Sequence, residues 1–229
     1  GPVYSEFESP RALPAHRLID VTASALSRLA QGRAAGTHYS SGGGYPFVVG
    51  VDGVGRVGDG RRVYFFGAPA PFGAMAERTI VPDAHCVPLP DELDDVTAAA
   101  IAIPGMSSWA ALTERTRLAA GETVLVNGAT GTSGRLAVRI AKHLGAAKVT
   151  PEGRRLRFVQ IGSIGGADVL LPGAVLRATA IELMGSGLGS VPLPRLLAAI
   201  RGVFGAVAPA GLAIETRAVP LSAVGEHWG

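Results

Sequence analysis

Cysteine and charge are both scarce in this 229-residue sequence. Cys86 is the single cysteine, which excludes an internal disulfide framework, and no group of cysteines and histidines has the spacing of a structural zinc site. Charged residues make up only 17% of the chain and hydrophobic residues 48%, so disorder is excluded and a buried core is expected. This cysteine content favours a reducing cytoplasm.

Long hydrophobic runs and basic clusters are also missing. The apolar stretches are interrupted well short of the roughly 18 residues that a membrane span requires, at Pro104, Arg177, Glu182, Arg195 and Arg201. No basic leader with an apolar core opens the chain. The net charge is +3, but the basic residues are scattered, which argues against a nucleic-acid partner. We therefore expect a soluble cytoplasmic protein without a membrane or nucleic-acid partner.

The first hundred residues have the pattern of short strands and turns. The expected strands and shorter β segments lie between glycine- or proline-containing turns, at residues 18–23, 48–57, 62–66, 75–81 and 86–88. Residues 25–31 predict one helical turn that ends at Gly32. We expect no long amphipathic helix in this part, which is therefore mostly β and turn.

The pattern changes after Asp91. A helix is expected from Asp95, with an interruption at Pro104-Gly105 and a second helix beginning at Ser107-Ser108. A buried-type strand over residues 123–126 then leads through a glycine-rich turn into a helix over residues 135–144 with one apolar face. Ala147 begins the next expected strand. This βαβ order predicts an α/β fold with a doubly wound parallel sheet that binds a nucleotide.

Three glycines in this turn, Gly128, Gly131 and Gly134, are spaced by three. Without side chains, the backbone lets a pyrophosphate approach the N–H groups at the helix N-terminus, where the helix dipole also favours an anion. The predicted cofactor-binding residues of the turn are Asn127, Gly128, Ala129, Thr130, Gly131, Thr132, Ser133 and Gly134. The alternative is a purely structural turn, because glycine is common in turns of any kind.

The sequence departs from this fold between residues 150 and 156. Residues 156–161 predict another strand, yet only residues 151–154 separate it from the preceding one, and a parallel neighbour needs a crossover of about a dozen residues. A stretch of the sheet is therefore expected to be missing, including the segment that would choose between NAD and NADP. Helical segments at 174–183 and 196–204 and a strand at 212–219 are expected in the remainder.

Several motifs in one order resemble the medium-chain dehydrogenase/reductase superfamily, in its zinc-independent quinone oxidoreductase-like branch. They lie at residues 45–55, 72–77, 88–90, 104–109 and 124–134. The resemblance implies a GroES-like β-rich catalytic domain over residues 1–105, a Rossmann domain over residues 106–204 that is incomplete at 150/151, and a return to the catalytic domain over residues 205–229. It also implies NADPH as cofactor and a homodimer.

Compared with this family, the chain lacks most of the central part of the Rossmann domain. It also looks shortened around residues 10–17 and at Val57-Gly58. Two explanations stay open: the sequence joins separate parts of a longer protein at Thr150-Pro151, which we favour, or it is a deletion variant with a poor adenosine pocket.

The resemblance also implies which residues contact the nicotinamide half of the cofactor. These are Ile161, Gly162 and Ser163 at the end of a strand, and Met184, Gly185 and Ser186 are expected to help. An ordinary strand-end turn is the alternative. Tyr39 stands where related reductases carry a tyrosine near the nicotinamide, and its phenol is the candidate catalytic group for donating a proton or a hydrogen bond. The alternative is a surface-loop tyrosine.

The histidines and buried-type carboxylates are expected to be structural. Gly50-Val51-Asp52 stands where the zinc-binding branch of the family has a Gly-His-Glu motif, so His38 and His85 are not interpreted as metal ligands. Cys86 is expected to be a small core residue. Asp52 and Glu77 are expected to stabilise the first domain through buried hydrogen bonds or an ion pair and not to act as bases.

The sequence thus predicts an NADPH-dependent, zinc-free reductase that passes hydride to a quinone or an α,β-unsaturated carbonyl. Two alternatives stay open. An enoyl-thioester reductase would share the fold and cofactor, and a noncatalytic nucleotide-binding module would keep the nucleotide site without turnover.

Overall fold

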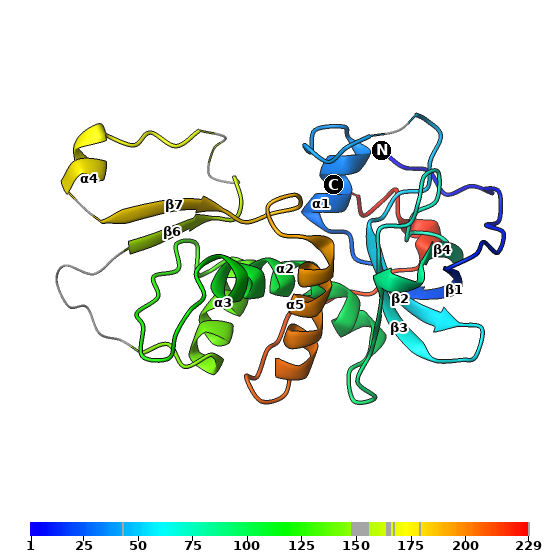
Figure 1. Ribbon diagram of the computed structural model, residues 1–229. Coiled ribbons are helices and arrows are strands. Elements are labelled where there is room, and N and C mark those ends of the chain that lie inside the picture. The colour runs from blue at the N-terminus through cyan, green and yellow to red at the C-terminus, as the bar shows by residue number, and fades with distance from the viewer. Residues whose placement is uncertain (43, 148–155, 164–165, 167, 179, 229) are drawn as a thin grey trace. The chain divides into compact units, whose positions relative to one another are not determined.

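A computed structural model describes residues 1–42, 44–147, 156–163, 166, 168–178 and 180–228. The chain forms two compact units (Figure 1). The first comprises Gly1–Ile103 together with Ala213–Gly229, and the second comprises Pro104–Leu212. The predicted join at Thr150-Pro151 and most of the strand expected from Ala147 lie outside the described residues.

The first unit is built on a five-stranded antiparallel sheet. Its strands are β1 His16–Ala23, β2 Asp52–Val57, β3 Arg62–Phe66, β4 Arg78–Pro82 and β5 Cys86–Pro88. Their spatial order is β4-β1-β2-β3-β5, and each neighbouring pair is antiparallel. The unit also contains the short helix α1 Arg28–Ala34 and 3₁₀ turns at Asp83–His85 and Leu221–Ala223.

Buried side chains on this sheet form a continuous apolar cluster: Ile19, Val57, Val63, Phe65, Ala74 and Val81. Glycine is required where β1 approaches β2 closely. A Cβ atom on Gly55 would lie 2.4 Å from the carbonyl oxygen of Asp20, and a Cβ atom on Gly53 would lie 2.7 Å from that of Ala23. The alternating glycines of β2 are therefore explained by close backbone contact.

Most of the strands predicted for the first unit are present, but fewer of them have the predicted bounds. β3 and β5 have the predicted bounds, whereas residues 48–51 do not belong to β2. The prediction that α1 ends at Gly32 is wrong, since the helix continues to Ala34. Gly36, two residues after the end of α1, has a left-handed backbone conformation with φ of +71°. Helices commonly end just before a glycine in this conformation, which explains why α1 ends after Gly32.

Three helices form the body of the second unit: α2 Asp95–Ala110, which starts in the first unit, α3 Thr132–His143 and α5 Leu193–Ala206. α2 and α5 pack closely at two glycines. A Cβ atom on Gly105 would lie 2.7 Å from Val203, and one on Gly202 would lie 2.5 Å from the Trp109 ring. The apolar face predicted for α3 is confirmed, because Leu136, Ala137, Ile140 and Ala141 are buried.

The predicted interruption at Pro104 is wrong. α2 passes through Pro104-Gly105 and continues as a π turn at Ala111–Arg115, where the Thr116 amide donates to the Ala111 carbonyl at 3.0 Å. Proline inside a helix costs about 3 kcal/mol, but Ile101, Ala102 and Met106 are buried around it. By length and composition the helix over Asp95–Arg115 could also cross a membrane, but 56% of its most apolar window is buried inside the protein.

The described strands of the second unit are a parallel pair, β6 Leu156–Gln160 and β7 Ile181–Gly185, with the short helix α4 Gly173–Ala178 between them in sequence. β6 confirms the predicted strand. The helix predicted over 174–183 is wrong in its second half, because residues from Ile181 onward pair with β6. Pairing with β6 outweighs the helical propensity of this segment, so it forms a strand.

Two further strand predictions are wrong. Residues 123–126 and 212–219 carry no strand assignment, and Leu125 is 93% exposed. The residues just before 123–126 do run beside the chain that follows α3. The Gly121 amide donates to the Gly145 carbonyl, and the Ala147 amide donates to the Glu122 carbonyl. A strand requires a ladder partner, and the partner expected for residues 123–126 continues outside the described residues.

Candidate nucleotide-binding and reductase site

The glycine turn lies at the N-terminus of α3, as predicted. Gly131 is the residue that caps the helix, with φ −76° and ψ 166°, and its carbonyl accepts the Arg135 amide at 2.9 Å. The amides of Thr132, Ser133 and Gly134 belong to the first helical turn, whose N–H groups have no acceptor within the helix. That turn contains no acidic residue, while Lys142 and His143 occupy the last turn. The positive end of α3 is therefore free to attract an anion.

The three glycines of the turn have different structural roles. Gly134 is needed for packing, since its Cβ atom would lie 2.1 Å from the Gly128 carbonyl oxygen. Gly128 has φ of +77°, which disfavours other residues. The Cβ atom of Gly131 would meet nothing closer than 3.6 Å, and its backbone conformation is open to any residue. The space beside Gly131 is therefore open, which leaves room for a phosphate-bearing cofactor to approach the first-turn amides.

Two residues that the sequence interpretation missed hold this turn in place. Ser108, buried inside α2, donates its hydroxyl to the Ser133 carbonyl at 2.9 Å and to the Pro104 carbonyl at 3.0 Å. Ser108 was expected near the start of a second helix, and its actual role depends on a contact 25 residues away in sequence. Arg135 donates from Nε to the Thr130 carbonyl at 2.9 Å. The turn is thus tied to α2 and to the first residues of its own helix.

The second predicted set of cofactor residues gathers at one edge of the parallel pair. Ile161, Gly162 and Ser163 follow β6, while Met184 and Gly185 end β7. Gln160 and Gly185 are register partners, and the Ser186 amide donates to the Gln160 carbonyl at 2.9 Å. Ligands of open parallel sheets bind at the carboxyl ends of the strands, and these five residues lie there.

Tyr39 lies in the first unit, on a loop fastened to α1. The Gly32 carbonyl accepts the amides of Thr37 and His38 at 2.9 and 3.2 Å. The His38 and Tyr39 rings lie 4.1 Å apart, and His38 Nδ1 accepts the Ser40 amide at 3.1 Å. Burial, and secondly the charge of Arg33, lowers the pKa of His38. The Tyr39 side chain is 70% exposed, and its catalytic role stays a prediction.

Asp52 and Tyr64 form a buried pair inside the first unit. The Tyr64 hydroxyl donates to Asp52 Oδ2 at 3.0 Å, which confirms the structural role predicted for Asp52. Burial raises the pKa of Asp52 to about 7, and the hydrogen bond from Tyr64 opposes that rise. Glu77 is exposed, so the buried interaction expected for it is wrong.

The remaining candidates lie in ordinary structural surroundings. His85 Nδ1 is 3.1 Å from the Phe66 carbonyl oxygen. Cys86 packs against the apolar cluster of the first sheet, and burial raises the pKa of its thiol to about 11. Among the described residues, no three His, Cys, Asp or Glu side chains are grouped as metal ligands would be.

No protein-family model matches the chain. It is 31% identical over 187 residues to the probable NADPH-dependent quinone reductase tdiC of Emericella nidulans, an alignment that covers 67% of this chain. The quinone oxidoreductase of Thermus thermophilus, solved also in complex with NADPH, superposes with a TM-score of 0.68 at 25% identity, over 91% of this chain and 83% of the other. These relatives and structures point to the quinone oxidoreductase-like members of the medium-chain dehydrogenase/reductase superfamily.

The likeness to this solved structure confirms the fold class expected from the sequence. A trans-enoyl reductase of Aspergillus terreus, pgmF, is 33% identical over 78 residues, which covers 34% of this chain and 22% of that protein. The chain spans about half the length of the quinone reductase relative, 52%.

Proposed function

We propose that this chain provides most of an NADPH-dependent oxidoreductase that passes hydride to a quinone or an α,β-unsaturated carbonyl. The observation that carries the proposal is the unobstructed helix N-terminus at Gly131, in a chain similar to NADPH-dependent quinone reductases. The glycine turn, residues 127–134, would hold the cofactor pyrophosphate through the first-turn amides of α3.

The other residues of the second unit have a positioning role. Ile161, Gly162, Ser163, Met184 and Gly185 would orient the nicotinamide end at the carboxyl edge of β6 and β7. When bound, NADPH supplies the hydride. The protein contributes orientation, and Tyr39 is the group that we propose to donate a hydrogen bond or proton to the acceptor oxygen.

A second function is favoured by one specific observation. The similarity to a trans-enoyl reductase covers a third of the chain, 34%, so an enoyl thioester is the alternative acceptor. Fold and cofactor would be the same, and only the substrate would differ. A nucleotide-binding module without turnover is the third possibility that the same experiment separates.

The setting of the activity is part of the proposal. We place the enzyme in the cytoplasm, acting without zinc, as a homodimer and on a small molecule. The single cysteine supports the reducing compartment. Metal content by elemental analysis and mass by light scattering test the zinc-free and dimeric parts directly.

The test follows NADPH oxidation against a panel of quinones, enones and enoyl thioesters, beside calorimetric measurement of NADPH binding. Turnover with quinones or enones is expected. Turnover confined to enoyl thioesters favours the alternative, and binding without turnover favours the module. Gly131→Val should weaken NADPH binding while leaving the fold intact, because its side chain would extend into the open space beside the first-turn amides of α3. Unchanged affinity in a folded Gly131→Val variant contradicts the proposed site.

Tyr39 is tested by Tyr39→Phe. A phenol that acts on developing charge contributes mainly in the transition state, so kcat should fall about tenfold to a thousandfold for an enone. NADPH affinity should change little. Tyr45→Phe is the matched control, since the Tyr45 hydroxyl donates to the Ala34 carbonyl at 3.0 Å in the same region. Equal kinetics in both variants and the natural chain would make Tyr39 a surface-loop residue.

A further inference from the structure

A small cavity lies in the first unit, between α1, the chain that follows Tyr39, and the segment around Phe72. Its volume is about 60 Å³, and it is partly open. The lining includes Ala30 and Arg33 from α1, Phe47 and Val51 from the chain before β2, and Phe72. Arg33 is the single charged residue among the described residues that line this cavity, and the others are apolar, glycine or proline.

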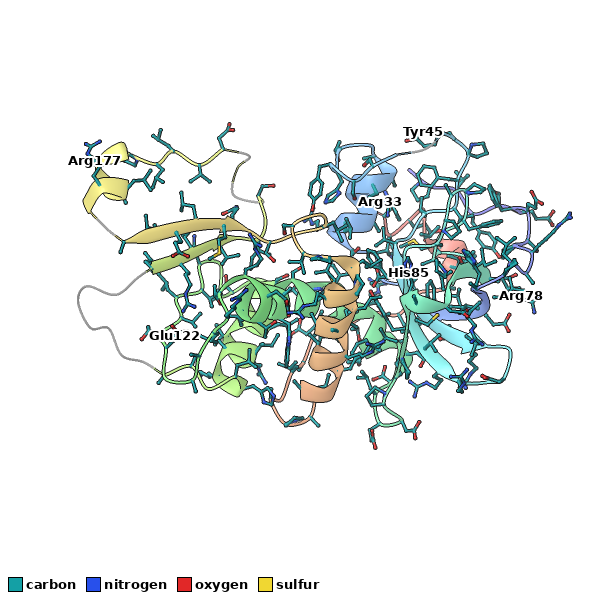
Figure 2. All side chains as sticks on the ribbon, in the orientation of Figure 1. Arg33, Tyr45, Arg78, His85, Glu122 and Arg177 are labelled. Carbon is teal, nitrogen blue, oxygen red and sulfur yellow. The ribbon has the colours of Figure 1, made fainter. Side chains whose placement is uncertain are left out.

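The charge of Arg33 is not neutralised by a carboxylate. Among the residues that the structure describes, the Arg33 side chain has no hydrogen-bond or ion-pair partner, unlike those of Arg17, Arg62, Arg78 and Arg195. The Arg33 side chain is half-buried and belongs to helix α1, as Figure 2 shows. Its charge helps to lower the pKa of His38, an effect that a neighbouring carboxylate would offset. A half-buried cation without a partner beside an apolar cavity favours an anionic ligand with an apolar body.

We propose that this cavity binds a short-chain monocarboxylate, with the carboxylate held by Arg33 and the hydrocarbon end against Phe47 and Phe72. The size follows from the volume. One water requires roughly 10–15 Å³ measured in this way, so about 60 Å³ accommodates roughly four to six non-hydrogen atoms. Arginine is suited to the task because its planar guanidinium donates two parallel hydrogen bonds to a carboxylate.

The proposed carboxylate site shares no residues with the proposed nucleotide site, and it is tested by a different experiment. Arg33 and the other lining residues belong to the first unit, whereas the glycine turn belongs to the second. Binding is therefore measured on the full chain without NADPH or acceptor. A failed reductase assay leaves the carboxylate site standing, and a failed carboxylate titration leaves the reductase proposal standing.

The experiment titrates isobutyrate into the protein in a carboxylate-free buffer, with calorimetry and ligand-observed NMR as readouts. Isobutyramide, which has the same shape without the charge, and inorganic phosphate, which has charge without an apolar body, are titrated in parallel. Isobutyrate should bind with Kd on the order of 1 mM, as expected for so small a ligand. Isobutyramide and phosphate should each bind at least about tenfold more weakly.

Two variants locate the site, and one serves as control. Arg33→Gln should weaken isobutyrate binding about 10- to 100-fold, the effect of losing a charge-assisted hydrogen-bonded partner. Arg28→Gln, at the exposed start of the same helix, should leave binding unchanged. Gly42→Leu offers an independent test, because Gly42 lines the cavity, its φ is ordinary and a Cβ atom there meets nothing within 4 Å. It should compete with the ligand for space in a folded protein.

Retained isobutyrate binding in Arg33→Gln, or equal binding of isobutyrate and isobutyramide, overturns the proposal. Phosphate binding as tight as that of isobutyrate also overturns it, since that pattern marks a general anion site. Absence of isobutyrate binding by the natural chain has the same consequence. If Arg33→Gln does not fold, Gly42→Leu decides: loss of binding supports the site and undiminished binding refutes it.

Discussion

The two units of this protein differ in how completely their sheets are paired. In the first unit all five strands have antiparallel neighbours, and Val54, Tyr64 and Phe65 are fully buried on them. In the second, the described sheet is one parallel pair, and its side chains Leu156, Phe158 and Leu183 are 54%, 42% and 51% exposed. Because a strand side chain is buried only where neighbouring strands and layers cover it, the difference in pairing explains the difference in burial.

Antiparallel and parallel strands differ in the length of chain needed to connect them. Antiparallel strands can be joined by a tight turn, as β2 and β3 are at Gly60, although β1, β4 and β5 pair with strands farther away along the chain. Each parallel strand requires a long crossover, and the described part of the second unit contains one, between β6 and β7. Apolar strand residues that a complete sheet would cover are then left exposed.

One tryptophan in each unit makes the comparison measurable. Trp228 belongs to the first unit and Trp109 to the second. In protein labelled with 5-fluorotryptophan, two ¹⁹F resonances report the unfolding of the two units separately during a denaturant titration.

The largest difference is expected for matched phenylalanines. Phe65→Ala removes a fully buried ring from the first sheet and should destabilise that unit by about 3–5 kcal/mol. Phe158→Ala, on the half-exposed β6, should cost the second unit less than about 1.5 kcal/mol. The Trp228 and Trp109 resonances respectively should report these shifts. Equal losses for the two variants would contradict the contrast in burial.

The next effect is the pH dependence of the first unit. The folded pKa of Asp52 is raised to about 7 from 3.8, so its protonated form is favoured by folding. The associated stability is fully present below pH 3.8 and is lost as pH rises through about 7, a change on the order of 4 kcal/mol. Asp52→Asn should remove this slope and exceed the natural chain in stability at pH 8.

The control for this experiment is Asp59→Asn, because the Asp59 carboxylate is exposed and bonded to Arg61. It should keep the downward slope between pH 4 and 7. A flat profile for the natural chain over that interval would show that Asp52 is not the titrating group.

A smaller effect distinguishes two glycines in the second unit. Gly134→Ala places a Cβ atom against the Gly128 carbonyl and should cost about 1–3 kcal/mol at the Trp109 resonance. Gly131→Ala has room for its Cβ atom and should cost less than about 1 kcal/mol, the usual range for an N-cap change. Both should leave Trp228 unaffected. Similar costs at the two positions would contradict the division of roles within the turn.

The smallest effects are expected for exposed ion pairs, whichever unit holds them. Arg17 and Asp83 lie 2.9 Å apart in the first unit, and Arg195 and Glu114 lie 2.7 Å apart in the second. Arg17→Gln and Arg195→Gln should each change stability by less than about 1 kcal/mol, and less again in 1 M salt. A loss above about 2 kcal/mol at either site would indicate a buried network.

Local patterns were sufficient for much of the fold and for the location of the candidate site. The strands β3 and β5, the apolar face of α3 and the glycine turn before it follow from residue spacing within a dozen positions. Those patterns succeed because each element is determined by its own periodicity and turn residues. The motif order across the chain also identified the family, which the relatives support.

Contacts between distant residues decided the rest. α2 continues through Pro104 because its surroundings bury it, Ser108 supports the glycine turn from 25 positions away, and residues from Ile181 onward form a strand because β6 pairs with them. The cavity beside Arg33 likewise brings together three separate stretches of chain. The sequence by itself determined many of the local elements and the glycine turn before α3. Only tertiary structure decided which segments found partners, because burial and strand pairing depend on residues far away along the chain.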